Sequence, residues 1–364
     1  MRGDDHQQSQ VFSYLSPEAR VRKDHPLRAI RAMVDEVLRQ MSRRFDSMYA
    51  KMGRPSIAPE KLLKAQLLQI LYSVRSERLL MEEMDYNLLF RWFVGLNADD
   101  PVWDATTFTK NRDRLLEADV AKEFLACVVE QARSNGLTSD EHFTVDGTLL
   151  EAWASQKSFQ PKQRLGSQPP EDPGNPTVNF HGEKRLNETH ESKTDPDALQ
   201  ARKGVGKESK LSYSGNLLVE NRHGLIIDAE VFQALGTAER DAALSMLEKL
   251  PGAGWLTVGG DKGFDTFGFV AECRNLHVVP HVAQNDRRPG GSAIDGRTTR
   301  HPGYALSQRK RKRIEECFGW LKTVALMRKL RHRRLGKIDW LFAFACAAYN
   351  LVRVRNLMAA VPAV

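Results

Sequence analysis

The hydrophobic period of the chain changes near residue 136, and this change limits the fold more than any other feature of the sequence. From Leu27 to Met48 the apolar side chains recur every three or four residues, which predicts an amphipathic helix with Pro26 in its first turn. Similar patterns predict further helices after Pro59 and up to about Leu96. Because a chain of 364 residues is long enough for two cores, we expect residues 1–135 to form an all-α N-terminal domain.

Beyond Asn135-Gly136, a pair typical of a helix C-terminus, short strand patterns alternate with helical ones. The predicted strands cover residues 142–146, 211–220, 225–232, 255–258 and 277–282, and the predicted helices cover residues 237–250, 307–330 and 338–358. Thr237 is expected to cap the first of these helices. This order suits an α/β domain over residues 136–364, with a mixed sheet flanked by helices of the ribonuclease-H-like kind.

Residues 156–207 interrupt this order. They are rich in Pro, Gly, Ser, Asn and charged residues, a composition that predicts a long loop insertion without a core of its own. A loop of this length inside a domain is uncommon unless it has a function, and contact with DNA is one such function. Within it, His190, Asp195 and Asp197 are candidates for metal or DNA contacts, although a turn around Pro196 explains the same residues.

Positive charge gathers near the C-terminus. The formal net charge is +8, and the segment from Arg309 to Arg334 contains eleven Lys or Arg residues against two acids, Glu315 and Glu316. Such a basic stripe indicates a polyanionic partner, most commonly nucleic acid, although a solvated helix face has the same composition.

Other features exclude several classes of protein. The four cysteines are far apart, which argues against a disulfide framework and against a structural zinc site. No secretory signal pattern opens the sequence, and the apolar run at residues 340–352 is shorter than the roughly 20 residues that a membrane span needs. We therefore expect a soluble, intracellular protein without a membrane partner.

A short basic helix is predicted from Asp104, a good N-cap residue, to Leu116. Its polar side would carry Lys110, Arg112 and Arg114. Several short helices followed by a basic one are typical of a helix-turn-helix DNA reader, but a helical bundle with ordinary surface charges explains the pattern equally well. These three cations are the candidate DNA-binding residues of the N-terminal domain.

Two aspartates follow strand patterns and lie beside glycines. Asp146 stands in Thr-Val-Asp-Gly-Thr, and Asp261 stands in Val-Gly-Gly-Asp-Lys-Gly-Phe-Asp. Phosphodiester cleavage needs its attacking and leaving oxygens stabilised in line, and two divalent ions held by carboxylates do this well. An aspartate at a strand end is also a common turn or cap residue, so the pair alone leaves both interpretations open.

A third acid, Glu315, lies inside the basic stripe. It follows Arg311 by four residues and precedes Lys322 by seven, so on a helix the three side chains fall within about 40° of one face. The two cations would keep the carboxylate ionised for metal binding and would hold phosphates. A surface salt bridge is the simpler explanation, but it does not account for the apolar side of the same helix, formed by Ile314, Phe318 and Leu321.

Taken together, these motifs resemble the acidic triad of DDE transposases, specifically of the bacterial insertion-sequence-five family. Arg311, Glu315 and Lys322 fit that family's signature Tyr-x2-Arg-x3-Glu-x6-Lys, in which x2, x3 and x6 count intervening residues. The Tyr position is occupied by Gln308, which is a departure from the signature. The blocks Val-Asp-Gly-Thr-Leu and Gly-Asp-Lys-Gly-Phe are similar to the blocks around the family's first and second acids.

The likeness runs from about residue 20 to the C-terminus. In the N-terminal half, Gly-Arg-Pro-Ser-Ile-Ala-Pro-Glu from Gly53 and Phe-Arg-Trp-Phe-Val-Gly-Leu from Phe90 are similar to the family's helical domain. The block that starts at Asn187 also resembles a segment that such transposases share. The resemblance places the insertion near residues 156–207 after the first strand of a ribonuclease-H-like core.

The resemblance also implies an activity and a set of partners. It implies that Asp146, Asp261 and Glu315 are catalytic and hold two Mg²⁺ ions, with Mn²⁺ as a substitute, while Arg311 and Lys322 hold DNA phosphates. Water would cut the DNA at the ends of the insertion sequence, and the 3′-OH ends would then attack the target. The expected partners are double-stranded DNA, at element ends and target, and further copies of the chain in a homodimer or higher assembly. The expected location is the bacterial cytoplasm, at the nucleoid.

Two other functions remain open at this stage. The first is a ribonuclease-H-like metal nuclease that cuts DNA without joining it. The second is an inactive copy that only binds DNA. Gln308 is the hint for an inactive copy, because Gln keeps a hydrogen-bonding group but lacks the ring of Tyr.

Overall fold

The N-terminal part of the chain is helical, as predicted. The computed structural model describes residues 16–49, 52, 56–116, 119–162, 185–204, 206–250 and 255–360, so Gly53 of the first N-terminal motif lies outside the described residues. The N-terminal helices are α1 (Pro17–Arg20), α2 (Pro26–Gln40), α3 (Ser42–Met48), α4 (Pro59–Leu71), α5 (Glu77–Tyr86), α6 (Leu88–Val94), α7 (Ala105–Leu116) and α8 (Val120–Ser134).

Two of the predicted helices are each divided in two. The apolar pattern that continues to Met48 spans α2 and α3, which meet at Met41. The pattern that continues to Leu96 spans α5 and α6, because the side chain of Asn87 accepts a hydrogen bond from the amide of Leu89 at 3.0 Å and starts a new helix. Apolar periodicity continues across both breaks, so it did not reveal them.

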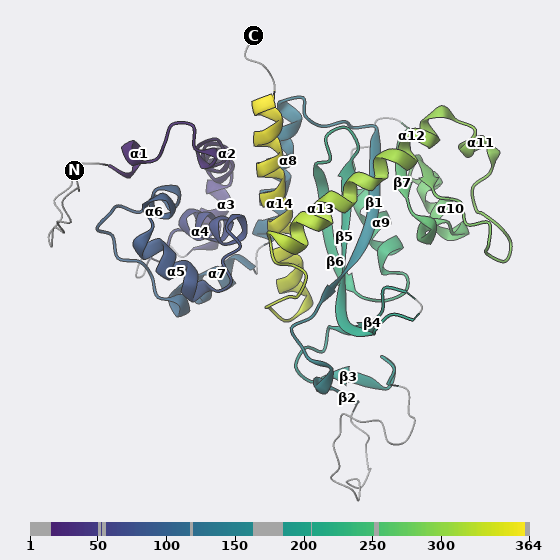
Figure 1. Ribbon diagram of the computed structural model, residues 1–364, viewed down its shortest axis with the longest axis horizontal. Coiled ribbons are helices and arrows are strands. Elements are labelled where there is room, and N and C mark those ends of the chain that lie inside the picture. Colours follow the sequence, from purple (N-terminus) through teal and green to yellow (C-terminus); the bar gives the residue numbers. More distant parts are fainter. Residues whose placement is uncertain are drawn as a thin grey trace, which may run out of the picture.

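A mixed sheet forms the second part of the fold (Figure 1). Its strands are β1 (His142–Glu151), β4 (Leu199–Ala201), β5 (Lys210–Glu220), β6 (Ile226–Gln233), β7 (Leu256–Gly260) and β8 (Val278–Val282). The order is β4-β5-β1-β7-β8, with β6 also paired to β5. The hairpin of β5 and β6 is antiparallel, as is the pairing of β1 with β5, whereas β1, β7 and β8 are parallel.

Helices cover both faces of this sheet. On β5, Leu217 and Val219 belong to the core formed with α13 (Ile314–Thr323) and α14 (Leu335–Ala360), whereas Leu218 belongs to the core with α9 (Ala238–Glu248) and α10 (Phe267–Asn275). Successive residues of a strand point to opposite faces, so both faces of β5 are apolar and both are buried. This arrangement confirms the predicted α/β, ribonuclease-H-like fold.

The segment predicted as one helix over residues 307–330 consists of several elements. After the short helix α11 (Gly296–Thr299), it comprises α12 (Pro302–Lys310), the 3-10 turn η3 (Arg311–Arg313) and α13, which ends at Thr323. Pro302 in the first turn starts α12 earlier than predicted. The predicted cap of α9 is also wrong in detail, because the side chain of Thr237 makes no capping hydrogen bond.

The helix α14 is the central packing element of the molecule. In Figure 1 it stands between the N-terminal helices and the sheet, and the indole nitrogen of Trp340 donates to the carbonyl of Leu115 at 3.1 Å. By length and composition α14 could cross a membrane, but 67% of its apolar window is buried inside the protein. The larger apolar core includes residues of both α4 and β5, so the division of the chain after residue 135 into two domains stays a prediction.

The insertion at residues 156–207 contains more structure than predicted. Its described parts include the 3-10 turn η1 (Gln156–Ser158), β2 (Phe159–Pro161), β3 (His190–Ser192) and β4, while residues 163–184 lie outside the described part. The prediction of a long loop is wrong for these parts, since Phe159 is buried and β4 pairs with β5. These short strands gain their burial from neighbouring elements, which composition alone does not reveal.

Candidate active site

Asp146 and Asp261 lie at the same level of the neighbouring parallel strands β1 and β7, Asp146 within β1 and Asp261 directly after the end of β7. The pairing of β1 with β7 aligns Thr144 with Gly259, and each aspartate follows two residues later. Adjacent strands lie about 4.8 Å apart, so this register brings the two carboxylates together. The sequence predicted that β1 ends at Asp146, and this is wrong, because β1 continues to Glu151 along β5. It is β7 that ends here, at Gly260, and it leaves one side of β1 unpaired.

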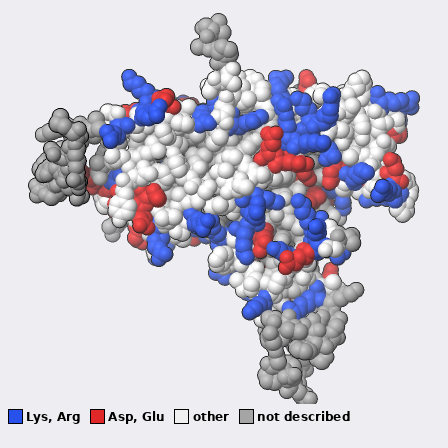
Figure 2. Space-filling view, in the orientation of Figure 1, with Lys and Arg blue, Asp and Glu red and all other residues white. Residues whose placement is uncertain are grey.

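Glu315 completes the predicted triad in one cavity. It lies in the first turn of α13, and it lines a cavity of about 840 Å³ together with Asp146 and Asp261. The polar wall also includes Lys203 and Lys322. Figure 2 shows acidic side chains between groups of basic ones on the face that α13 crosses. Acids from three elements that are distant in the sequence therefore meet in one basic-edged hollow.

The carboxylates in this cavity repel one another. Burial, together with the negative charges of Asp261 and Glu239, raises the pKa of Asp146 to about 7. The amide of Gly147, which donates to Asp146 Oδ1 at 2.8 Å, and the guanidinium of Arg311 act in the opposite direction. A cation among these carboxylates would relieve the repulsion and favour their ionised forms.

Arg311 is held close to the acids by its neighbours. Its Nε donates to Gln308 Oε1 at 3.0 Å, and the amide nitrogen of Gln308 donates to the carbonyl of His281 at 2.5 Å. A Cβ on Gly259 would lie 3.5 Å from the Cβ of Arg311, an ordinary contact distance, and a tighter 3.3 Å from Oγ1 of Thr144, so η3 packs closely against β7. Gln308 thus has a defined role at the position where the resembled signature has Tyr.

Lys322, in the last turn of α13, lines the same cavity as Glu315. Its Nζ donates to Oγ1 of Thr148 at 2.5 Å, which ties α13 to β1. Burial lowers the pKa of Lys322, and the nearby cations Lys203 and Arg328 lower it further, while Asp146 raises it. The structure therefore brings both cations of the predicted signature to the acid pair.

Only two of the three predicted cations of α7 lie on its polar side. Lys110 and Arg114 are exposed, and Asp104 caps the helix as predicted by accepting from the amide of Thr107 at 2.9 Å. Arg112 is 2% exposed and forms an ion pair with Glu77. The prediction that Arg112 lies on the polar side is therefore wrong: its charge stabilises the packing of α7 against α5.

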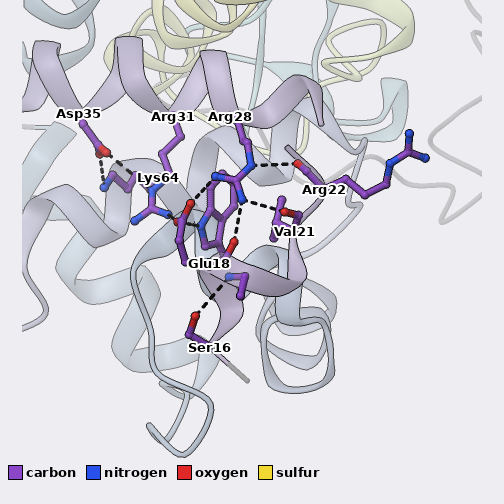
Figure 3. Close-up of polar contacts among 10 residues, drawn as sticks. Ser16, Glu18, Val21, Arg22, Arg28, Arg31, Asp35 and Lys64 are labelled. Carbon is purple, nitrogen blue, oxygen red and sulfur yellow. Dashed lines mark hydrogen bonds and ion pairs between the residues drawn. The ribbon is translucent and has the colours of Figure 1, made fainter. Parts of the chain in front are cut away.

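Other N-terminal cations are also engaged inside the protein. Figure 3 shows Arg28 and Arg31 of α2 beside Glu18, and the guanidinium carbons of the two arginines lie 5.2 Å and 4.5 Å from the ring centre of Trp92. Glu18 accepts a hydrogen bond from the Trp92 indole and forms an ion pair with Arg28. These cations fasten α1 and α6 to α2, which leaves other residues to meet a polyanion.

The acids of the insertion have a structural role. Asp195 Oδ1 accepts from the amide of Arg334 at 3.0 Å and from the hydroxyl of Tyr213 at 2.8 Å. Asp197 Oδ2 accepts from the amide of Leu335 at 2.9 Å. The two carboxylates satisfy amides at the start of α14, and this accounts for the Asp-Pro-Asp sequence. His190 is buried and stacks on Phe159 with ring centres 5.5 Å apart.

Sequence reasoning missed one acid of the cavity. Glu239, in the first turn of α9, lines the same cavity as the triad. It belongs to no recognisable motif, and an acid in a first turn is ordinary in any helix. The signal that could have pointed to it is Gly147, whose missing side chain leaves the space that Glu239 fills.

The donor chemistry of the cavity suits a hard divalent cation. The candidate ligands are carboxylate oxygens, and within the described residues no three His, Cys, Asp or Glu side chains form a ready-made metal-ion site. The acids instead surround an open space. Mg²⁺ keeps several waters and is commonly held by one or two carboxylates together with substrate phosphates, so an open acidic cavity fits this ion.

Two family models match the chain. One, described as a transposase domain, matches residues 15–114, and the other, described as a transposase DDE domain, matches residues 171–351. The chain belongs to the DDE transposases. The second match includes Asp261 and Glu315, whereas Asp146 precedes it. DDE transposases cleave DNA phosphodiester bonds and transfer strands with the help of divalent metal ions, so this transposase is an enzyme that acts on DNA.

Solved transposase structures align with most of this transposase. A piggyBac transposase synaptic complex with hairpin DNA aligns at 11% identity and a TM-score of 0.38, covering 92% of this chain and 76% of that one. A Mos1 transposase paired-end complex with the left transposon end aligns at 10% identity and a TM-score of 0.20, covering 90% and 94%. At these scores neither likeness adds weight to the family assignment. None of the curated protein sequences compared with the chain matches it.

Proposed function

We propose that this transposase cuts and joins DNA at a centre made of Asp146, Asp261 and Glu315. The observation that carries the proposal is that these acids come from β1, from the end of β7 and from α13, and line one cavity. Acids brought together by the fold from distant parts of the sequence, with cations beside them, are what metal-dependent phosphoryl transfer requires.

The three carboxylates would hold Mg²⁺, with Mn²⁺ as a substitute. When bound, the divalent ions supply charge that stabilises the attacking and leaving oxygens of the displacement. Arg311 and Lys322 bind non-bridging phosphate oxygens and fix the DNA strand against the acids. The attacking groups are water and then the 3′-OH of the cut strand, so the reaction needs no nucleophilic side chain.

The DNA that extends beyond the centre would meet two basic surfaces. The first consists of the exposed cations of the segment from Arg309 to Arg334 that flank the cavity. The second consists of Lys110 and Arg114 on α7, which we propose contact the ends of the insertion sequence, in the manner of a helix-turn-helix reader. Both surfaces bind phosphates, so affinity for DNA should fall steeply with salt.

The assembly that performs transposition would be a homodimer or a higher oligomer, because two element ends must be brought together. We further propose that the enzyme belongs to the bacterial insertion-sequence-five group and acts in the cytoplasm at the nucleoid. Residues 1–135 would serve as the DNA-binding domain and residues 136–364 as the catalytic domain.

The proposal is tested on a supercoiled plasmid that carries the gene and its flanking DNA, incubated with purified protein and Mg²⁺, Mn²⁺ or EDTA. We expect metal-dependent breaks at the ends of the element, followed by joined products. Breaks scattered over the plasmid without joining would replace the proposal with a metal nuclease. Specific binding without any break would replace it with a DNA-binding protein that has lost its activity.

A further inference from the structure

Asp146 and Glu315 of the proposed triad meet on one face of the sheet. On β1, Phe143 and Val145 pack into the core with α9 and α10, whereas Leu150 packs into the core with α13 and α14. Side chains alternate along a strand, so Asp146 points to the same face as Thr148 and Leu150, the face that α13 covers. The hydrogen bond from Lys322 of α13 to Thr148 agrees with this assignment.

Glu239 approaches the same acids from the other face. It lies in the first turn of α9, and Gly147 faces α9 because it follows Asp146 in the alternation. A Cβ on Gly147 would lie 2.4 Å from Cγ and 2.8 Å from Cδ of Glu239, distances that real Cβ atoms do not show. The glycine thus leaves an opening in β1 that the Glu239 side chain fills, beside the point where β7 ends at Gly260.

The carboxylate of Glu239 has no protein partner in the described part of the chain. Arg240 is the adjacent cation, but its guanidinium nitrogens donate to the carbonyls of Gly263 at 3.2 Å and Gly236 at 3.3 Å. Stabilisation of the helix N-terminus does not explain the placement, since Asp241 in the same turn serves that purpose while exposed to solvent. Glu239 instead lines the cavity of the triad.

We propose that Glu239 is a fourth metal-binding carboxylate of this centre, reaching it through the opening at Gly147 while Glu315 reaches it from α13. The inference rests on the proposed function, because it takes the triad to be the metal centre. Hard divalent cations favour several carboxylate oxygens, and a ligand from each face of the sheet would hold them within the cavity rather than at its rim.

The test measures the binding of Mn²⁺ to the full-length protein without DNA. The concentration of free Mn²⁺ is monitored through its electron paramagnetic resonance signal. We compare the wild type with Glu239→Gln, Glu239→Asp, Asp241→Asn and Asp146→Asn. Glu239→Gln should weaken binding by at least about tenfold, the scale of losing a group that supports a metal site. Glu239→Asp keeps the charge but withdraws it by one methylene, and it should weaken binding as well. Asp241→Asn should bind as the wild type does.

Each outcome separates this inference from the proposed function. Wild-type binding by Glu239→Gln, with binding lost in Asp146→Asn, would overturn the role of Glu239 and leave the triad intact. Wild-type binding by Asp146→Asn would overturn the triad itself. Wild-type binding by Glu239→Asp with weak binding by Glu239→Gln would show that Glu239 acts through its charge alone, and the proposal of ligation would be wrong.

Folding is checked by the thermal midpoint of each variant without metal. Glu239→Gln removes a partly buried, unpaired charge, so its midpoint should not fall below that of the wild type. If this variant nevertheless fails to fold, Glu239→Asp decides the question, because it keeps the charge and nearly the same volume.

Discussion

Gln308 accepts a hydrogen bond from Nε of Arg311 at 3.0 Å and donates one to the carbonyl of His281 at 2.5 Å. This side chain therefore links η3 to β8 and fixes the cation beside Asp146. The resembled family has Tyr at this position, and the loss of the ring raised the question of an inactive copy. The structure gives the Gln a positioning role that is compatible with an active centre.

Removing this link should slow DNA cleavage. In Gln308→Leu, Arg311 loses its acceptor, and a hydrogen bond to a charged group contributes about 1.5–3 kcal/mol. We expect single-turnover cleavage to be about 10–100-fold slower, since 1.4 kcal/mol is a factor of about ten. Arg311→Ala is the control: if Gln308 acts through Arg311, the double variant should be no slower than Arg311→Ala alone. Effects that multiply would contradict this role.

Substitutions of Arg112 and Arg114 in α7 should differ in their effects on stability and on DNA binding. Arg112→Met breaks the ion pair between the buried Arg112 and the half-buried Glu77, and it should cost about 3–5 kcal/mol of the free energy of unfolding in urea titrations. Arg114→Ala removes an exposed charge and should leave stability nearly unchanged. In DNA-binding titrations at several salt concentrations, Arg114→Ala should bind more weakly than the wild type. The slope of the logarithm of affinity against the logarithm of salt concentration should become shallower by about one. Equal stability losses in both variants would contradict the assignment.

The contribution of His332 to the stability of the transposase should fall in mild acid. Burial, together with the nearby cations Arg112 and Lys337, lowers its pKa to about 3, although Asp113 acts in the opposite direction. In the unfolded chain the imidazole titrates near 6.5, so between these values the unfolded state binds more protons. The stabilisation is complete above about pH 6.5 and declines by up to about 1.4 kcal/mol per pH unit below it.

Urea unfolding at pH 8 and pH 5.5 measures this contribution. The wild type should lose about 1.4 kcal/mol more between these two conditions than His332→Asn, which cannot titrate. An equal loss in both proteins would show that His332 is not the buried neutral group described above.

Much of the fold could be predicted because its elements are locally encoded. The hairpin of β5 and β6 has strand patterns on both sides of a turn-rich link, and α7 begins at a good capping residue, Asp104. The errors lie where tertiary contacts decide. The extension of β1 beyond Asp146 depends on pairing with β5. The strands of the insertion depend on contacts with elements outside it, such as the pairing of β4 with β5. The burial of Arg112 depends on Glu77, a partner on another helix.

The candidate site shows the same division. Asp146, Asp261 and Glu315 could be proposed from sequence because each stands in a motif with glycines or cations at characteristic spacing. Glu239 could not, since its relation to the site arises from the crossing of α9 over Gly147. Arg311 lies near the acids as helical spacing predicts, although it belongs to a 3-10 turn, because that turn runs directly into α13 with helical backbone angles at Arg313 and Ile314.

The most direct test of the account measures Mg²⁺-dependent cleavage of a double-stranded oligonucleotide that carries one element end. Asp146→Asn, Asp261→Asn and Glu315→Gln are compared with Glu316→Gln, a matched control because Glu316 is the exposed next residue of α13. We expect the first three variants to lose about a thousandfold in rate, equivalent to about 4 kcal/mol, while they bind the DNA within about threefold of the wild type. Glu316→Gln should cleave normally. Cleavage near the wild-type rate by any of the three, or an equal defect in Glu316→Gln, would contradict the assignment of the catalytic acids.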